Sequence, residues 1–264
     1  MKIIAVIPAR FASTRLPGKP LLSETGKPLI QHVVEAAQQA QSLERIIVAT
    51  DDPRIAAAVM SFGGEAMMTR ADHSTGTDRV AEVAAQIEEA AIIVNIQGDE
   101  PEIAGPTIDR LARLLQDDPE APMATLCTPI RDEAVYRDPS CVKVVCSRRG
   151  RALYFSRSPI PCYRDGLPVP TTAAGLTLAF LHLGLYAYRR DFLLSLGSLP
   201  TSPLEAAEKL EQLRVLEAGY PIAIAVVDEP SIGIDTPEDY RRFVERCVTA
   251  VKAHGHERCS FPGG

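Results

Sequence analysis

Short strand-like runs alternate with amphipathic segments over the first half of the chain, and this alternation constrains the fold more than any other feature. The runs at residues 3–7, 46–49, 65–68 and 92–96 have the length of strands, and most are apolar throughout, as in strands buried on both faces. Apolar residues at helical spacing predict helices over 27–40, from Pro53 onward, over 77–89 and over 106–116. This order predicts an α/β fold with a mostly parallel central sheet that is flanked by helices on both faces.

The pattern changes after about residue 122. Strand-like runs at 123–128, 142–146, 152–155 and 180–188 have few helices between them, which predicts an antiparallel extension of the sheet or a smaller lobe over it. Ser202 and Thr236 each precede a proline and have an acidic residue three positions on, which predicts two helix starts around a strand at 222–227. The proline- and glycine-containing segment 158–172 predicts a mobile surface loop. We expect one domain over 1–246, with 123–200 as its extension, and a C-terminal tail over 247–264.

Charge and cysteine content limit the class of protein. The 28 basic and 34 acidic residues give a net charge of −6, which argues against binding of nucleic acid or of an anionic membrane through a positive surface. The six cysteines include no C-x-x-C pair, which argues against a zinc knuckle and a thioredoxin-type motif. In a chain of this size we expect reduced, mostly buried thiols and a cytoplasmic protein. The most apolar run, 176–188, is too short for a membrane-spanning helix, which needs about 20 residues.

The loop after the first predicted strand, residues 8–20, collects positive charge. Arg10, Arg15 and Lys19 lie in it together with small residues such as Ser13. Guanidinium groups, an ammonium and backbone N–H groups are what a triphosphate requires, so this loop is a candidate phosphate site. The sequence contains neither the P-loop nor the G-x-G-x-x-G motif. A solvated basic turn remains the alternative interpretation.

Two carboxylates also follow apolar segments. Asp99 comes after the strand at 92–96, with Gly98 to allow a tight turn, and Asp235 precedes the last predicted helix. Ligands bind outside the carboxyl ends of parallel strands, and Mg²⁺ prefers oxygen ligands combined with substrate phosphates. Taken alone, a carboxylate in the position of Asp99 is more often a helix or turn cap, and Asp235 is also explained by its interaction with the helix dipole. Their separation along the chain does not decide whether they meet.

Other candidates carry weaker signals. The polar segment 70–79 lies between a strand and a helix, where a loop that reads a nucleotide base would lie. His182 interrupts an apolar strand and is, by itself, more typical of a hydrogen-bonded core residue. Glu211 and Gln212 lie in a predicted helix, where solvent exposure is the default. No nucleophile triad and no H-E-x-x-H motif can be singled out.

Seven segments together resemble the CMP-Kdo synthetases, the 3-deoxy-manno-octulosonate cytidylyltransferases within the larger sugar nucleotidyltransferase superfamily. In chain order these are IPARFASTRLPGKPL, RADHSTGTDR, NIQGDEP, ALYFSRSPIP, HLGLYAYRRDFL, LEQLRVLEAGYPI and GIDTPEDY. The likeness extends from about residue 2 to residue 244. The basic loop is shared with the wider group, whereas YFSR, HLG-x-Y and LEQLR are more specific to the Kdo enzymes.

The resemblance implies a Rossmann-like nucleotidyltransferase fold, a homodimer and an Mg²⁺-dependent reaction in lipopolysaccharide biosynthesis. In that reaction CMP passes from CTP to the anomeric hydroxyl of 3-deoxy-D-manno-octulosonate (Kdo), and pyrophosphate leaves. The region 123–200 would then serve the sugar side and dimerisation.

The residue roles that the resemblance implies fall into four groups. Those at the reacting centre would be Arg10, Lys19, Gln97, Asp99 and Asp235. The nucleotide side would comprise Arg10, Ser13, Arg15, Lys19, Arg70, Asp72, Ser74, Gly76 and Gln97. The Kdo side would comprise Arg157, His182, Tyr186, Glu211 and Gln212, and the Mg²⁺ ligands would be Asp99 and Asp235.

Two other functions remain as alternatives. The first is the same transfer to another acidic sugar, such as a sialic acid or an amino-substituted Kdo, because a single changed pocket residue can redirect such an enzyme. The second is a non-catalytic relative that binds nucleotide as a regulator. The intact set of basic and acidic residues argues against the second alternative.

Overall fold

The computed structural model describes residues 1–12, 16–166, 179–228 and 232–256. Its centre is a nine-stranded sheet in the order β3-β2-β1-β4-β8-β5-β9, with β6 pairing with both β7 and β8. The strands are β1 (Lys2–Ala9), β2 (Arg45–Thr50), β3 (Glu65–Met68), β4 (Ala90–Asn95), β5 (Met123–Pro129), β6 (Lys143–Cys146), β7 (Ala152–Ser156), β8 (Phe180–Arg189) and β9 (Ile222–Val226). The expected α/β architecture is confirmed.

The helices occupy the connections between these strands. They are α1 (Leu29–Ala37), α2 (Pro53–Ser61), α3 (Gly76–Ala85), α4 (Gly105–Asp117), α5 (Glu133–Arg137), α6 (Arg190–Leu196), α7 (Pro203–Glu208), α8 (Gln212–Glu217) and α9 (Pro237–His256), with a short 3₁₀ turn η1 (Lys19–Leu21). The helix predicted over 77–89 ends earlier than expected, at Ala85. Sequence analysis missed α5 and α6, which lie in the half of the chain where we expected few helices.

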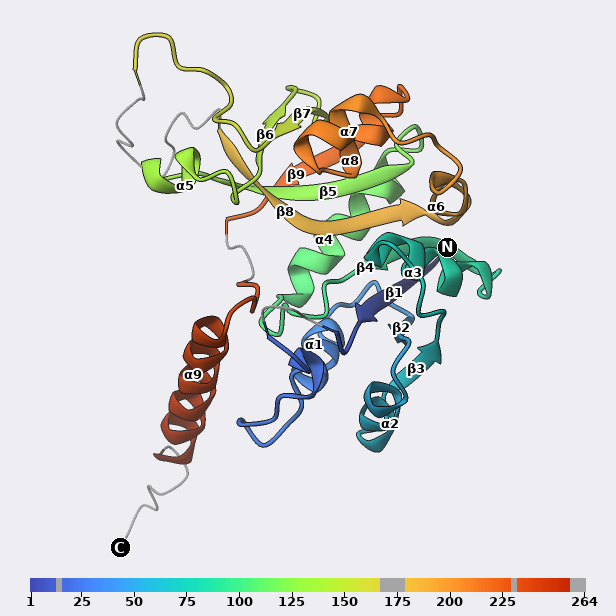
Figure 1. The fold of residues 1–264 in the computed structure, drawn as a ribbon, viewed down its shortest axis with the longest axis vertical. Coiled ribbons are helices and arrows are strands. Elements are labelled where there is room, and N and C mark those ends of the chain that lie inside the picture. Colours follow the sequence, from blue (N-terminus) through green and yellow to red (C-terminus); the bar gives the residue numbers. More distant parts are fainter. Residues whose placement is uncertain (13–15, 167–178, 229–231, 257–264) are drawn as a thin grey trace, which may run out of the picture.

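The sheet changes from parallel to mixed at β8. Strands β1 to β4 pair in parallel, whereas β8 lies between β4 and β5 and is antiparallel to both. The hairpin β6–β7 adds further antiparallel pairing, and β9 returns parallel to β5. The second half of the chain is therefore an extension of one continuous sheet, as Figure 1 shows.

Apolar side chains on both faces of the sheet build two cores. Along β1, Ile3, Ala5 and Ile7 belong to one core, and Ile4 and Val6 belong to the other, because successive side chains of a strand point to opposite faces. The first core also contains residues of α1, α2 and α4, and the second contains residues of α3, α6 and α8. The sheet is thus flanked by helices on both faces, as predicted.

The predicted helix starts are confirmed in detail. Asp52 caps α2 by accepting a hydrogen bond from the Arg54 backbone N–H at 2.9 Å. Ser202 and Glu205 form a reciprocal capping box at the start of α7. Thr236 and Asp239 bond each other's backbone N–H groups at the start of α9. Such caps satisfy helix N–H groups that have no partner within the helix.

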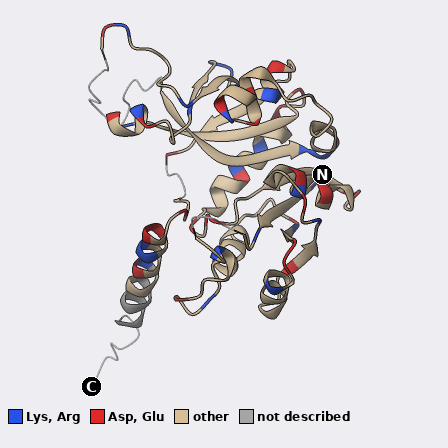
Figure 2. Ribbon diagram, viewed as in Figure 1, with Lys and Arg blue, Asp and Glu red and all other residues tan. Residues whose placement is uncertain are grey.

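Helix α9 continues past residue 247, where we placed the start of a tail, and reaches His256. It packs against α1 through Phe243, whose ring lies 5.1 Å from that of His32 in an edge-to-face arrangement. Figure 2 shows positive and negative positions mixed on this helix, and Arg241 pairs there with Glu238 at 2.6 Å. No helix in the described part of the chain is long and apolar enough to cross a membrane. Of the predicted loop 158–172, residues 158–166 form bends and turns, and the remainder lies outside the described residues.

Candidate active site

Lys19 brings together two carboxylates that are far apart in the sequence. It begins η1, directly after Gly18, which has the positive φ of 66° that glycine tolerates. The Lys19 ammonium donates to Asp99 Oδ2 at 2.7 Å and to the Ile234 carbonyl at 2.6 Å, and lies 3.4 Å from Asp235 Oδ1. The structure thus settles what the sequence left open, because Asp99 and Asp235 face the same cation.

The loop that carries Asp99 is pressed against the end of β1. A Cβ atom on Gly98 would lie only 2.7 Å from the Pro8 carbonyl oxygen, so the close approach requires glycine. The Asp99 carbonyl accepts from the Ile234 N–H at 2.8 Å, which fixes the segment before α9 beside it. Gln97 donates through Nε2 to the Gly184 carbonyl of β8 at 2.8 Å. This loop therefore connects the parallel half of the sheet to its antiparallel extension.

The donor set fits a metal that arrives with phosphates. No group of three or more metal-binding side chains is found within the described ranges, so Asp99 and Asp235 would hold an ion as a pair. Mg²⁺ is commonly bound by one or two carboxylates, with substrate phosphates and water completing its shell. The two side chains are 30% and 48% exposed and so remain accessible from solvent. Both carboxylates already have a positive neighbour in the Lys19 ammonium.

Arg10 contacts the loop predicted to lie near the nucleotide. Its Nη2 donates to the carbonyls of His73 and Thr75, at 3.0 and 2.8 Å. Thr75 caps α3 in a reciprocal capping box with Asp78, so this contact places the first turn of the helix beside the end of β1. Of the phosphate-loop candidates, Ser13 and Arg15 lie outside the described residues.

The remaining nucleotide-side candidates lie along the same loop. Arg70 and Asp72 are largely exposed and pair with each other, with Arg70 Nε 3.1 Å from Asp72 Oδ1. Gly76 begins α3, where an added Cβ would make an ordinary contact with Pro8 at 3.6 Å. Ser74 lines a pocket of about 290 Å³ together with Arg70 and Asp72.

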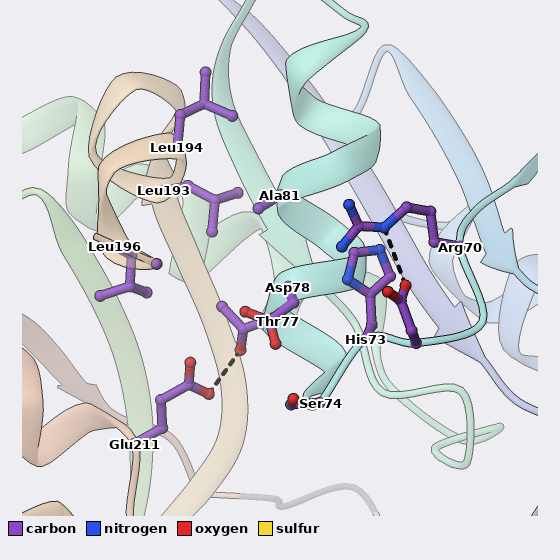
Figure 3. A pocket seen from close by; sticks show the side chains of 12 residues that line it. Arg70, His73, Ser74, Thr77, Asp78, Ala81, Leu193, Leu194, Leu196 and Glu211 are labelled. Atoms are coloured by element: carbon purple, nitrogen blue, oxygen red, sulfur yellow. Dashed lines mark hydrogen bonds and ion pairs between the residues drawn. The ribbon is translucent and has the colours of Figure 1, made fainter. Parts of the chain in front are cut away.

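That pocket also reaches a residue predicted for the sugar side. Figure 3 shows the first turn of α3 and the 70–74 loop on one side of it, the leucines of α6 on another, and Glu211 beside Thr77. Glu211 Oε2 accepts from the Thr77 hydroxyl at 2.9 Å. Burial raises the pKa of Glu211, whereas the hydrogen bond from Thr77 and the nearby Arg214 charge lower it.

His182 and Tyr186 lie close together on β8. The His182 ring packs at 4.8 Å from Phe155 and 5.4 Å from Tyr186, and its Nε2 lies 3.0 Å from Thr125 Oγ1. Burial lowers the pKa of His182 to about 3, so the imidazole is neutral at physiological pH. Burial and the Glu211 charge raise the pKa of Tyr186, which keeps its phenol protonated.

Gln212 follows Glu211 and is almost fully buried. Its Nε2 has no hydrogen-bond partner among the described residues. Gln212 also lines a small cavity with Tyr186 and Glu211. The structure therefore gathers four of the five predicted sugar-side residues around β8 and the start of α8.

Arg157, the fifth, follows β7 and is held by different neighbours. Its Nε donates to the Glu208 carbonyl at 2.7 Å, and its Nη1 donates to the Pro139 carbonyl at 3.1 Å. Its own carbonyl accepts from Lys143 at 2.6 Å. Within the described part of the chain, no hydrogen bond is found from Nη2. Phe155, two residues earlier, provides the contact to His182.

Sequence analysis missed several residues that position this site. Lys143 is fully buried and donates to the carbonyls of Asp138, Cys141 and Arg157. Thr77 and Thr125 contact Glu211 and His182, as described above. A lysine or threonine in a predicted strand or first helical turn normally indicates a solvent-facing position, so nothing local indicated these contacts.

The fold and the site define a cytidylyltransferase. A family model described as cytidylyltransferase matches residues 4–225. The 3-deoxy-manno-octulosonate cytidylyltransferase of Syntrophotalea carbinolica is 55% identical over 246 residues, which are 92% of this chain and 97% of the relative. The enzyme of the same name from Rhodopirellula baltica is 50% identical, over 93% of this chain and 98% of the relative. The chain belongs to the 3-deoxy-manno-octulosonate cytidylyltransferase family.

Solved structures agree with this assignment. The structure of CMP:2-keto-3-deoxy-manno-octonic acid synthetase in complex with CTP superposes with a TM-score of 0.87 at 47% identity, covering 95% of this chain and all of that one. A 4-diphosphocytidyl-2C-methyl-D-erythritol synthase from Anaerococcus prevotii, at 12% identity and a TM-score of 0.59, covers 95% of this chain and 96% of its own. The second likeness extends to the fold alone.

Proposed function

We propose that this chain transfers CMP from CTP to the anomeric hydroxyl of Kdo, forming CMP-Kdo and pyrophosphate. The observation that carries the proposal is the pairing of both Asp99 and Asp235 with Lys19. This pairing lies beyond the carboxyl end of β4, where Gln97 donates a hydrogen bond to β8. A basic and acidic centre of this kind suits nucleotidyl transfer, which depends on positioning and on neutralisation of charge rather than on a covalent nucleophile.

The reaction is a substitution at phosphorus. The anomeric oxygen of Kdo bonds to the α-phosphorus of CTP, the bond from that phosphorus to the bridging oxygen of pyrophosphate breaks, and the hydroxyl proton is released. Lys19 would balance phosphate charge, and Arg10 would hold the 73–75 backbone against the nucleotide. Gln97 would lie beside the reacting atoms.

We include Mg²⁺ in this proposal, with Asp99 and Asp235 as its protein ligands. When bound, Mg²⁺ would neutralise phosphate charge and lower the pKa of the attacking hydroxyl. Mg²⁺ would compete with the Lys19 ammonium for the two carboxylates. The ammonium would then be free to pair with the phosphates of CTP.

The sugar side would recognise an acidic polyhydroxyl substrate. Arg157 offers Nη2 to the Kdo carboxylate, since its Nε is already engaged by a backbone carbonyl. Neutral His182, the Tyr186 phenol, Glu211 and Gln212 would exchange hydrogen bonds with the sugar hydroxyls. The buried and unpaired Nε2 of Gln212 supports this assignment, because a buried donor without a partner is costly unless a ligand accepts from it.

The direct test is pyrophosphate release with CTP, Kdo and Mg²⁺, with sialic acid and an amino-substituted Kdo as competing acceptors. Release that is fastest with Kdo supports the proposal. Preference for another acid would retain the reaction and change the sugar. Binding of CTP without turnover on any acid would identify a regulatory relative instead. Omission of Mg²⁺ in the same assay tests the metal.

We further propose a cytoplasmic homodimer that supplies activated Kdo for lipopolysaccharide. The family resemblance supports the dimer, and the described cysteines, which are free thiols, support a reducing compartment. Light scattering of the full chain during gel filtration tests the dimer, since a monomer mass at assay concentration would contradict it.

A further inference from the structure

One buried hydroxyl joins the nucleotide side of the site to its sugar side. Thr77 is 9% exposed, lies in the first turn of α3, and donates to Glu211 Oε2 at 2.9 Å. Tyr188 of β8 lines a small cavity together with Glu211. The helix that follows the nucleotide loop is therefore joined to the start of α8 through the Thr77 hydroxyl.

The direction of this hydrogen bond follows from its two partners. A threonine hydroxyl has one proton to donate, and an ionised carboxylate only accepts. Thr77 therefore donates to Glu211. Burial raises the pKa of the neighbouring Tyr188 well above its usual range, so a neutral phenol lies on the same small cavity as Glu211.

The hydrogen bond from Thr77 occupies Oε2 of Glu211 and leaves Oε1 free to accept a hydrogen bond from a ligand. Oε1 has no protein donor among the residues that the structure describes, and Glu211 lines the pocket of about 290 Å³. Figure 3 shows the carboxylate with one oxygen directed to Thr77 and the second directed away from it. The hydroxyl thus fixes which oxygen is offered to a ligand.

Thr77 is itself held by the nucleotide side. Arg10 Nη2 donates to the carbonyls of His73 and Thr75, and the Thr75–Asp78 capping box closes the turn in which Thr77 lies. The hydrogen bonds that fix this loop therefore also fix the position of the Thr77 hydroxyl.

We propose that Thr77 is a positioning residue of the cytidylyl transfer: its hydroxyl holds the Glu211 carboxylate in place, with Oε1 directed to the hydroxyl groups of the bound sugar. This role rests on the function proposed above. Thr77 would therefore affect binding of the sugar, although the residue lies at the start of the helix that follows the nucleotide loop.

The charge state of Glu211 gives an independent measure of this contact. Burial raises its pKa, the Thr77 hydrogen bond and Arg214 lower it, and Asp78 and Glu205 raise it. Tyr186 and Tyr188 face it as neutral phenols. Removal of the Thr77 hydroxyl takes away a bond to the charged form, and the pKa of Glu211 should therefore rise.

The experiment compares Thr77→Val, which preserves shape, with Thr77→Ser, which preserves the hydroxyl. For the valine variant we expect KM for Kdo to rise about 10- to 100-fold, as for the loss of one hydrogen bond to a charged group, with KM for CTP nearly unchanged. The acid limb of kcat/KM for Kdo should move up by about one pH unit. Serine should restore both the KM for Kdo and the position of the acid limb. Thr107→Val, in the first turn of α4, controls for a threonine-to-valine change in the first turn of a helix.

A second readout does not depend on turnover. Carboxyl carbon NMR of the substrate-free protein, with Glu211 assigned through Glu211→Gln, should show a higher pKa in Thr77→Val than in the wild type and Thr77→Ser. If valine unfolds the chain, Thr77→Ala serves in its place. An unchanged KM for Kdo and an unchanged Glu211 titration in an active enzyme would overturn the role of Thr77. A wild type inactive on Kdo would instead contradict the proposed function, and with it the sugar-specific role.

Discussion

Asp99 and Asp235 are each an ordinary carboxylate, and their significance comes from sharing one cation. Lys19 is 13% exposed and bridges them, so each carboxylate is held ready for a positive partner. We expect Asp99→Asn to lower turnover about a thousandfold or more, because an amide neither ligates Mg²⁺ well nor neutralises Lys19. The free energy of unfolding should fall by only about 1 kcal/mol, as for a partly exposed ion pair. Pyrophosphate release and urea unfolding measure the two quantities.

A matched control is available at Asp109. This carboxylate accepts from Ser42 at 2.8 Å and from the Gln41 N–H at 3.1 Å, away from the candidate site. Asp109→Asn should therefore lose stability while keeping the wild-type kcat. Near-normal activity of Asp99→Asn would remove Asp99 from the metal site.

At the scale of elements, the loop between β4 and α4 sets the geometry of the centre. Gly98→Ala would place a Cβ 2.7 Å from the Pro8 carbonyl, so the loop would shift and carry Asp99 and Gln97 with it. We expect kcat to fall about 10- to 100-fold, since displacement of catalytic groups by about 1 Å has costs of that order. Gly105→Ala is the matched control, because its Cβ would lie 2.5 Å from the backbone of Gln39. This variant should lower thermal stability with little effect on kcat. Equal kinetic losses in both variants would contradict the assignment.

The elements also separate what the sequence predicts from what it does not. Strands β1 to β4 and their helices are predictable because each is marked by local periodicity and caps such as Asp52. The insertion of β8 between β4 and β5 is not predictable from the sequence. Its pairing, for example of Ile93 with Tyr188, joins segments that lie far apart in the chain and have similar composition. The candidate site divides in the same way. Asp99 is predictable from its place after a strand, whereas its meeting with Lys19 depends on tertiary structure.

At the scale of the whole molecule, the partly buried imidazole of His182 couples folding to pH. Its pKa is about 3 when folded and near 6.5 when unfolded, so between these values the unfolded chain binds more protons. Stability should therefore fall as the pH drops from 6.5 toward 3, and should not change on this account above pH 7.

Urea unfolding of the wild type and His182→Gln isolates this contribution. Between pH 7 and pH 5 the wild type should lose about 2 kcal/mol more than the variant, which has no imidazole at this position. His32, whose pKa is also lowered by burial, is present in both proteins, so its contribution cancels in the difference. Parallel curves over this range would mean that the wild-type His182 titrates as in the unfolded chain, and that the sugar side presents an imidazolium rather than a neutral ring at pH 5.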